Sequence, residues 1–290
     1  MNNKNNRINF KKSRTYLLAL LPFVGIVALF LAVPIVMILV RSFMPEGAVG
    51  FTLDNYISIF SRRLYQQAVV NSMIVSVSSA LIGLVIGFFG ANAAHKSNRK
   101  TKTFFMSILN MTSNFAGIPL AFAYIILLGS AGVLVMFGKQ FGIGFLADFD
   151  LYNVWGILLT YIYFQVPLAT LLLIPAFDAL KQEWRESVRL MGGNSTKYWL
   201  RVGIPVLLPS ILGTLSVLFA NAVAAYATAY ALLASNFSLL PIRISEQFVG
   251  DVVQHKEFGS ALAVILMMLM VLAIYVNNRI LKNNRGAMAK

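Results

Sequence analysis

Residues 186–209 read ESVRLMGGNSTKYWLRVGIPVLLP, a polar and basic stretch with two adjacent glycines that lies between two long apolar runs. Apolar residues lead into it every three or four positions, at Leu180, Trp184, Val188 and Met191. This is the periodicity of one helix face. Gly192 and Gly193 predict the end of that helix, because glycine adopts the left-handed C-cap conformation without steric cost.

A second short helix is predicted after the turn. Asn194 or Ser195 is a good N-cap residue, and the helix would carry Tyr198, Trp199 and Val202 on one side. Pro205 then opens the next apolar run, where its missing N–H costs nothing. Exposed aromatics on such a loop are suited to insertion into a groove of a partner protein. They equally suit a helix pair whose rings lie at lipid headgroups, and the residues alone leave both readings open.

The composition is that of a membrane protein. Of the 290 residues, 58% are hydrophobic and only 12% are charged, whereas soluble domains carry about 25% charged residues. The chain contains no cysteine, which excludes disulfides, iron–sulfur clusters and thiolate zinc sites. His95 and His255 are too few and too far apart in sequence to suggest a metal site.

Six apolar segments are long enough to cross the hydrocarbon core, which takes about 20 residues of helix. The predicted fold class is therefore all-α, a polytopic membrane protein with six transmembrane helices. The predicted spans are residues 17–40, 69–91, 104–128, 154–177, 205–233 and 259–276.

The distribution of positive charge predicts the orientation. With six spans both termini share a side, and 18 of the 24 Lys and Arg residues fall on that side, whereas seven of the ten acids fall on the other. The positive-inside rule places both termini in the cytoplasm. The net charge of +14 then reflects the orientation of the chain, because the excess Lys and Arg residues face anionic membrane lipid. Nucleic acid is not expected as a partner.

Two outer loops predict short helices of their own. Residues 51–60, FTLDNYISIF, indicate a turn and a short amphipathic helix before the second span. Residues 129–150 are partly apolar, but Lys139 and several glycines interrupt them. A short interfacial helix is therefore predicted there rather than a seventh span.

The predicted spans contain no ionisable side chain in their cores. Proton- or sodium-driven carriers need such a group at depth, so a secondary carrier is disfavoured. The phosphate-binding pattern G-x-x-x-x-G-K-[ST] is also absent from the chain. If ATP drives this protein, the ATPase is another polypeptide.

The stretch at 186–209 resembles the loop signature of binding-protein-dependent ABC importer permeases. That signature reads E-A-A, three residues, G, nine residues, a branched aliphatic, one residue, an aliphatic and P. The matching positions are Glu186, Gly192, Val202, Ile204 and Pro205, with Trp199 where the family often has Phe. Three positions depart from the pattern: Ser187 and Val188 replace the alanines, and Met191 replaces a common Asp.

The resemblance implies a type I ABC importer permease fold and a mechanism. Residues 180–204 would form coupling helices that dock on a cytoplasmic ABC ATPase dimer, with Glu186 paired to a basic residue there and Gly192 and Gly193 forming the turn. ATP and magnesium would be bound by that partner, and no cofactor is expected in this chain. The implied domains are a basic cytoplasmic N-terminus (1–16), the permease domain (17–281) and a basic tail (282–290), in a bacterial cell membrane.

The resemblance extends to permeases of the spermidine/putrescine type, through FTLDNY at 51–56 and FGSALAV at 258–264. Relatives in that group also move iron(III), thiamine and 2-aminoethylphosphonate, so the solute stays open. An extracytoplasmic solute-binding protein would deliver the solute. A second, different permease subunit is expected more than a second copy of this chain.

A few polar residues within the spans are candidates for a translocation path: Asn110, Asn114, Asn221, Tyr226 and Tyr230. Tyr226 and Tyr230 share a helix face, and tyrosine rings can attract a passing cation weakly. The alternative for each residue is interhelical packing. The alternatives for the whole chain are a carrier or channel not coupled to ATP, a membrane scaffold, or half of an ABC exporter.

Overall fold

A computed structural model describes residues 20–48, 50–233, 238–249 and 254–288, and the basic N-terminus 1–16 lies outside the described residues. The described chain is helical throughout and contains no strand, which confirms the all-α class. Its helices after the first turns of the chain are η1 (Ala28–Ala32), α2 (Val33–Ser42), α3 (Asp54–Ser61), α4 (Arg63–Lys96), α5 (Arg99–Asn114), α6 (Ile118–Leu128), α7 (Val133–Phe141), α8 (Gly144–Ala147), α9 (Val154–Asp178), α10 (Gln182–Leu190), α11 (Ser195–Tyr198), η2 (Trp199–Gly203), α12 (Ile204–Ala224), α13 (Ala227–Leu233), α14 (Leu240–Phe248) and α15 (Lys256–Met288).

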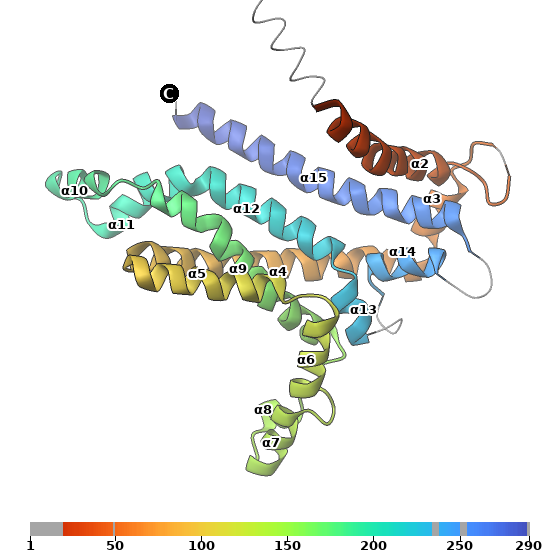
Figure 1. The fold of residues 1–290 in the computed structure, drawn as a ribbon, viewed down its shortest axis with the longest axis horizontal. Helices are drawn as coiled ribbons and strands as arrows, with labels where there is room; N and C mark the ends of the chain where they lie inside the picture. Colours follow the sequence, from red (N-terminus) through yellow and green to blue (C-terminus); the bar gives the residue numbers. More distant parts are fainter. Residues whose placement is uncertain (1–19, 49, 234–237, 250–253, 289–290) are drawn as a thin grey trace, which may run out of the picture.

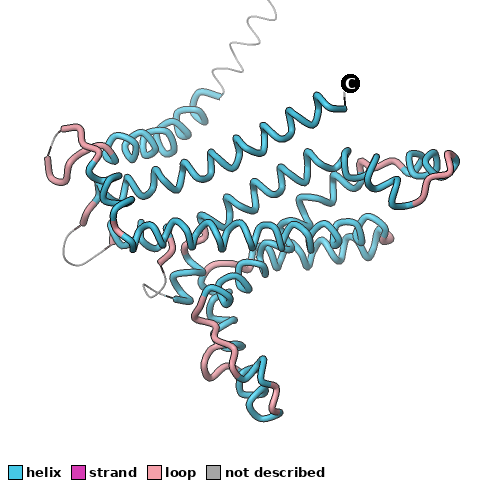
Figure 2. The backbone as a smooth tube through the Cα atoms, turned by 180° about the vertical axis from the view of Figure 1, so that it is seen from behind, coloured by secondary structure: helices cyan, strands magenta, loops and turns pink. Residues whose placement is uncertain are grey.

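Six helical segments of the described chain are long and apolar enough to cross a membrane, as predicted. They are Leu20–Ser42, Arg63–Lys96, Ile118–Phe141, Val154–Asp178, Ser195–Ala224 and Lys256–Lys282. The long helices run roughly side by side (Figure 1), with α10 and α11 at one end of the bundle and α3 and α14 at the other. Figure 2 shows from behind that α6, α7 and α8 lead away from this bundle.

The centre of the bundle is the contact between α4 and α9. Here α4 presents glycines that leave no room for a side chain. A Cβ on Gly83 would lie 2.7 Å from Cβ of Gln165, and one on Gly87 would lie 2.5 Å from Cβ of Ala169. Small residues let membrane helices approach closely, and packing rather than a hydrophobic driving force then stabilises the pair.

The predicted third span, residues 104–128, is wrong as a single helix. Helix α5 ends at Asn114, and α6 begins at Ile118 after Gly117, whose φ is 77° and ψ is −145°. Only glycine adopts that conformation readily. Hydropathy predicts an apolar run here, but the positive φ divides it, and α6 turns away from α5 (Figure 1).

The predicted fifth span, residues 205–233, is also divided. Helix α12 ends at Ala224, and α13 begins at Ala227. The hydroxyl of Tyr161 on α9 donates to the carbonyl oxygen of Ala225 at 2.7 Å, so a tertiary contact satisfies a backbone group that the break leaves free.

Helix α3 covers most of the predicted amphipathic segment at 51–60, which agrees with the sequence. The prediction for residues 129–150 is wrong in part, because α7 joins α6 in the candidate span Ile118–Phe141 and only α8 lies beyond it. At the C-terminal end, α15 passes the predicted start of the tail at 282 without a break and continues to Met288.

Candidate functional site

The predicted helix–turn–helix at residues 180–204, called the arm below, is present. Helix α10 ends at Leu190, Gly192 has φ 73°, and two backbone bonds close the turn. The Gly193 amide donates to the Val188 carbonyl at 2.8 Å, and the Gly192 amide donates to the Arg189 carbonyl at 2.9 Å. This pair of bonds is a Schellman motif, which satisfies carbonyls at a helix C-terminus.

The second half of the arm begins as predicted but ends differently. The Asn194 side chain accepts from the Lys197 amide at 2.9 Å and caps α11. The expectation that Pro205 opens a separate span is wrong, because α11, the π-helical turn η2 and α12 form one continuous helix, Ser195–Ala224. The arm is therefore rigidly continuous with a membrane helix on this side.

The prediction that Tyr198 and Trp199 are exposed is also wrong. Tyr198 is only 5% exposed. The Trp199 ring is half-buried and lies 6.1 Å from the Phe88 ring and 6.2 Å from the Phe177 ring, centroid to centroid. A Cβ on Gly203 would lie 2.5 Å from Cε3 of Trp199, so this glycine leaves space for the indole. The aromatics anchor the arm to α4 and α9.

The exposed part of the arm is its tip. Leu190 is 89% exposed and Met191 is 79% exposed, and they are the last residue and the C-cap of α10. Helix α10 projects from the end of the bundle (Figure 1). Glu186 is exposed and accepts from Nε2 of Gln182 at 2.9 Å. The remaining motif residues divide between exposed (Ser187, Gly192, Ile204) and half-buried (Val188, Gly193, Val202, Pro205).

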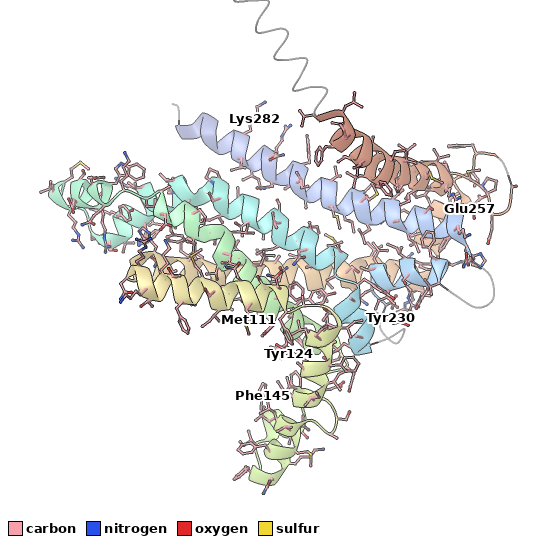
Figure 3. All side chains as sticks on the ribbon, viewed as in Figure 1. Met111, Tyr124, Phe145, Tyr230, Glu257 and Lys282 are labelled. Carbon is pink, nitrogen blue, oxygen red and sulfur yellow. The ribbon has the colours of Figure 1, made fainter. Side chains whose placement is uncertain are left out.

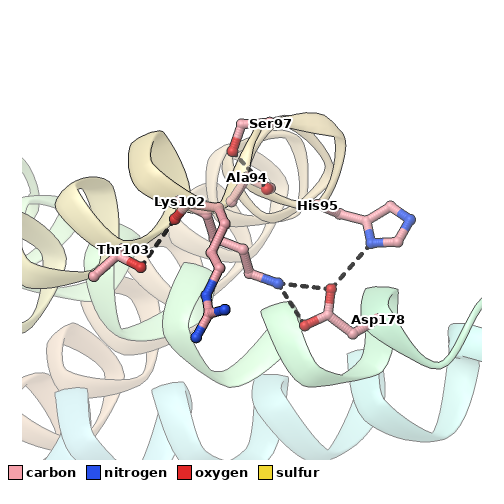
Figure 4. A network of polar contacts seen from close by, with 7 residues as sticks. Ala94, His95, Ser97, Lys102, Thr103 and Asp178 are labelled. Carbon is pink, nitrogen blue, oxygen red and sulfur yellow. Dashed lines mark hydrogen bonds and ion pairs between the residues drawn. The ribbon is translucent and has the colours of Figure 1, made fainter.

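Three helix ends meet at the base of the arm (Figure 4). Asp178, the last residue of α9, accepts from Nζ of Lys102 at 2.7 and 2.6 Å and lies 3.1 Å from Nδ1 of His95. Sequence reasoning placed Asp178 at a span end but missed this cluster, because its partners are 76 and 83 residues away in sequence. The cluster ties α4 and α5 to the residue from which the arm departs.

The polar residues of the spans divide into two groups. Some bridge segments of the chain: Gln165, fully buried on α9, donates to the Leu218 carbonyl of α12 at 2.7 Å, and Asn71 donates to the Ser238 carbonyl at 3.0 Å. By contrast, Asn110 and Asn114 donate only within α5, to Met106 and Asn110 carbonyls, and both are exposed. Contacts within this chain therefore explain why Gln165 and Asn71 are polar, but they do not explain Asn110 and Asn114.

The two tyrosines of the candidate path, which their spacing places on one helix face, stack on each other. The Tyr226 and Tyr230 rings lie 5.2 Å apart, centroid to centroid, at an interplanar angle of 25°. Ser245 on α14 donates to the Tyr226 hydroxyl at 3.1 Å. Tyr230 and Asn221 are exposed, and Figure 3 marks Tyr230 on α13 together with Met111 on α5 and Tyr124 on α6.

The structure joins the two helix breaks, which sequence reasoning did not foresee. The Gly117 amide donates to Oγ1 of Thr228 at 2.9 Å, and the same hydroxyl lies 3.3 Å from the Gly117 carbonyl oxygen. Thr228 is buried. Because Asn114 and Tyr226 each lie within three residues of this contact, the candidate path residues of α5 and α13 belong to one region of the fold.

Within the described part of the chain, no group of three or more His, Asp or Glu side chains is placed to hold a metal ion. The arrangement that remains is a projecting arm at one end of a helix bundle and exposed polar side chains beside two broken membrane helices.

Comparison with known proteins agrees with this architecture. Residues 80–284 match the family of binding-protein-dependent transport system inner membrane components. The spermidine/putrescine transport system permease protein PotB of Haemophilus influenzae is 26% identical over 258 residues, which cover 86% of this chain and 88% of that protein.

Solved structures show the same fold. The crystal structure of a bacterial ABC transporter that imports the acidic polysaccharide alginate matches with a TM-score of 0.71 at 17% identity, covering 94% of this chain and 99% of that chain. A bacterial alginate ABC transporter in complex with an alginate pentasaccharide-bound periplasmic protein matches with a TM-score of 0.67 at 16% identity, covering 94% and 96%. At such identities the likeness concerns the fold and not the solute.

Proposed function

The chain belongs to the family of binding-protein-dependent transport system inner membrane components and is a permease subunit of an ABC importer, and from that premise we propose that its arm couples it to a separate ATPase. The observation that carries the proposal is the projecting tip of α10. Leu190 and Met191 are exposed there, beside Glu186 and the fixed turn at Gly192. Exposed large apolar side chains at a rigid tip suit insertion into a partner's groove.

The proposed partner is a cytoplasmic ABC ATPase dimer that binds ATP and magnesium. Its closure on ATP would pull the arm, and the continuous helix Ser195–Ala224 would carry that displacement into the membrane. The docking must favour one state of the permease over the other, since a partner with equal affinity for both states shifts nothing. The arm, residues 180–204, is the proposed coupling element, and Trp199 acts in it as an anchor.

The proposed orientation places the arm and both termini in the cytoplasm. The support is the excess of Lys and Arg that the sequence assigns to one side of the membrane, in the arm and in the basic segments 1–16 and 282–290 that flank the permease domain 17–281. An extracytoplasmic solute-binding protein would then meet the opposite end of the bundle, where α3 and α14 lie (Figure 1).

The proposed translocation path passes Asn110, Asn114, Asn221, Tyr226 and Tyr230. The support is that four of these side chains, all but that of Tyr226, are exposed on the single chain, within segments that the sequence predicts to span the membrane. An amide facing hydrocarbon without a partner costs several kcal/mol, so such groups face water or another protein. A second permease subunit, a different chain rather than a second copy, would cover this face and complete the path.

The proposed solute class is a polyamine, supported by the similarity to PotB and by the stacked tyrosines, whose faces attract cations. A polyamine would be delivered by the binding protein, which supplies the tight and selective site. The path itself holds no acid at depth and so would let the cation leave.

A gentle affinity purification of the tagged chain from its native membrane tests the function. We expect an ATPase, a second permease and a binding protein to accompany it, and we expect native mass spectrometry of that binding protein to reveal a polyamine. Isolation of the chain alone, together with uptake that survives ATP depletion, would contradict the coupling proposal and favour a carrier. A different small ligand would overturn only the solute class.

A further inference from the structure

A polar cavity of about 500 Å³ lies at the base of the arm, between α10 on one side and the ends of α4 and α9 on the other. Its polar lining comes from both sides: Lys96 from the end of α4, Lys181 from the segment before α10, and Arg185 and Arg189 from α10. One chain therefore supplies the whole lining. Its size suits a small molecule or a lipid headgroup rather than a helix of a partner protein.

The cavity has an excess of positive charge that this chain does not neutralise. Glu186 is the one acid in its lining and accepts from Gln182. Among the described residues, the ion pairs within 4.0 Å are those of Asp178, Glu246 and Glu46. One of them joins Asp178 to His95, which also lines the cavity, but none includes Lys96, Lys181, Arg185 or Arg189. Lys96, Lys181 and Arg189 are exposed, so water screens part of the repulsion among the four cations, and an anion that joined them would lower it further.

The geometry of the lining favours a phosphate group. Arg185 and Arg189 are four residues apart on α10 and so lie on the same helix face. Guanidinium groups bind phosphate oxygens in a bidentate manner, and the two lysines add point charges. Phe177 and Trp199 supply an apolar wall next to these cations, which suits the glycerol and first methylenes of a phospholipid.

We propose that this cavity binds a phosphate-bearing anion, which bridges α10 to the end of α4. The ligand is the headgroup of an anionic phospholipid or a free organic phosphate. In either case the phosphate joins Arg185 and Arg189 on the arm to Lys96 on the bundle, so its occupancy controls how firmly the arm is held. The cavity shares Arg185, Glu186 and Arg189 with the arm, but it lies apart from the exposed tip at Leu190 and Met191 and from the path residues.

The test compares phosphate binding by the full complex carrying the wild-type chain or variants. The first variant is Arg185→Gln/Arg189→Gln. The second is Lys96→Gln/Lys181→Gln, which removes the same charge without changing α10. The matched control is Arg99→Gln/Lys100→Gln, two exposed residues at the same end of the bundle that do not line the cavity.

Two measurements distinguish the sources of the phosphate. In the first, native mass spectrometry counts phosphatidylglycerol retained by complexes released from vesicles of phosphatidylcholine and phosphatidylglycerol. In the second, calorimetry measures binding of glycerol 3-phosphate to complexes in phosphatidylcholine alone. Because charge-assisted hydrogen bonds are strong, we expect each cavity variant to bind at least about tenfold more weakly than the wild type and the control.

Loss of phosphatidylglycerol retention in both cavity variants but not in the control identifies a lipid headgroup. If the two cavity variants instead lose only the binding of glycerol 3-phosphate, and the control does not, the ligand is a soluble phosphate. Equal binding by all four chains, or no binding by any, overturns the proposal, and the cations are then neutralised by acids of a partner protein. The readout is binding and not uptake, so this outcome leaves the assignment of the permease untouched.

Discussion

Gly192 and Gly193 are adjacent in sequence but are required for different physical reasons. Gly192 has φ 73° with open space around it, so only its backbone conformation needs glycine. Gly193 has an ordinary conformation, but a Cβ there would lie 2.5 Å from Cγ1 of Val188. The sequence predicted a turn at this pair, because local capping chemistry decides it. The close contact of Gly193 depends on the final helix geometry and was not predictable.

Gly192→Val tests the turn. A β-branched residue resists a positive φ, so we expect import to be lost while the chain still inserts in the membrane, as measured by solute uptake and membrane fractionation. Gly142→Val is the matched control, because Gly142 also has a positive φ with open space around it but lies after α7, far from the arm in sequence. Normal uptake by Gly192→Val would contradict the coupling role of the arm.

Trp199→Ala tests whether this side chain is an anchor. Its indole packs on Phe88 and Phe177, so we expect truncation to lower the free energy of unfolding by about 2–4 kcal/mol. Thermal unfolding of the purified complex measures this loss. Trp184→Ala, at a half-buried position on α10, is the control and is expected to cost less. If both variants unfold at the wild-type temperature, Trp199 is free to contact a partner instead.

Tyr226→Ala and Asn221→Leu test the path. We expect both to reduce uptake several-fold without weakening association with the ATPase, because neither residue belongs to the arm. Uptake at a fixed level of membrane-inserted complex is the measurement, and co-purification of the ATPase is the control. Unchanged uptake in both variants would leave these residues with packing roles alone.

At the scale of the element, the two helix breaks differ in how visible they are in the sequence. Gly117 is followed by Ile118 and Pro119, and a glycine before a helix with proline in its first turn is a local signal for a new start. The break at Ala225 has no such signal. It is stabilised by the Tyr161 hydroxyl, which is 64 residues away in sequence. Apolar runs predict how many spans exist, but not whether one span is two helices.

The same distinction explains the arm. Its helix, turn and N-cap follow from neighbouring residues, and the sequence predicted all three. The burial of Tyr198 and the packing of Trp199 depend on side chains from α4 and α9, which local periodicity does not report. The cluster at Asp178 is likewise long-range. The sequence shows which residues form this cluster, but it does not show that they come into contact.

Thr228→Val tests the link between the two breaks. The substitution keeps the shape of the side chain but removes the hydroxyl that contacts Gly117, and we expect a loss of about 1–2 kcal/mol in unfolding free energy together with slower uptake. Thr228→Ser keeps the hydroxyl and should restore both. Thr170→Val is the matched control, since buried Thr170 bonds only within its own helix, to the Val166 carbonyl. Equal behaviour of the two valine variants would contradict a shared role of the breaks.

At the scale of the whole molecule, the absence of native cysteine makes the orientation directly testable. Single cysteines at Ser61 and Thr196 would report on opposite ends of the bundle, and both positions are exposed. We expect a membrane-impermeant maleimide to label Ser61→Cys on intact cells, and to label Thr196→Cys only after the membrane is opened. The reverse pattern would contradict the cytoplasmic placement of the arm.

The exposed amides of α5 bear on how unassembled copies of the protein are degraded in the cell. Asn110 and Asn114 bond only to their own helix, so a copy that lacked the proposed second subunit would leave both amides uncovered. Such a copy would differ from an assembled one by these uncovered amides, on a surface that quality-control proteases of the membrane can contact. If the proposed second subunit covers these amides, unassembled chains would carry their own degradation signal, and the scarcest subunit would set the number of finished transporters.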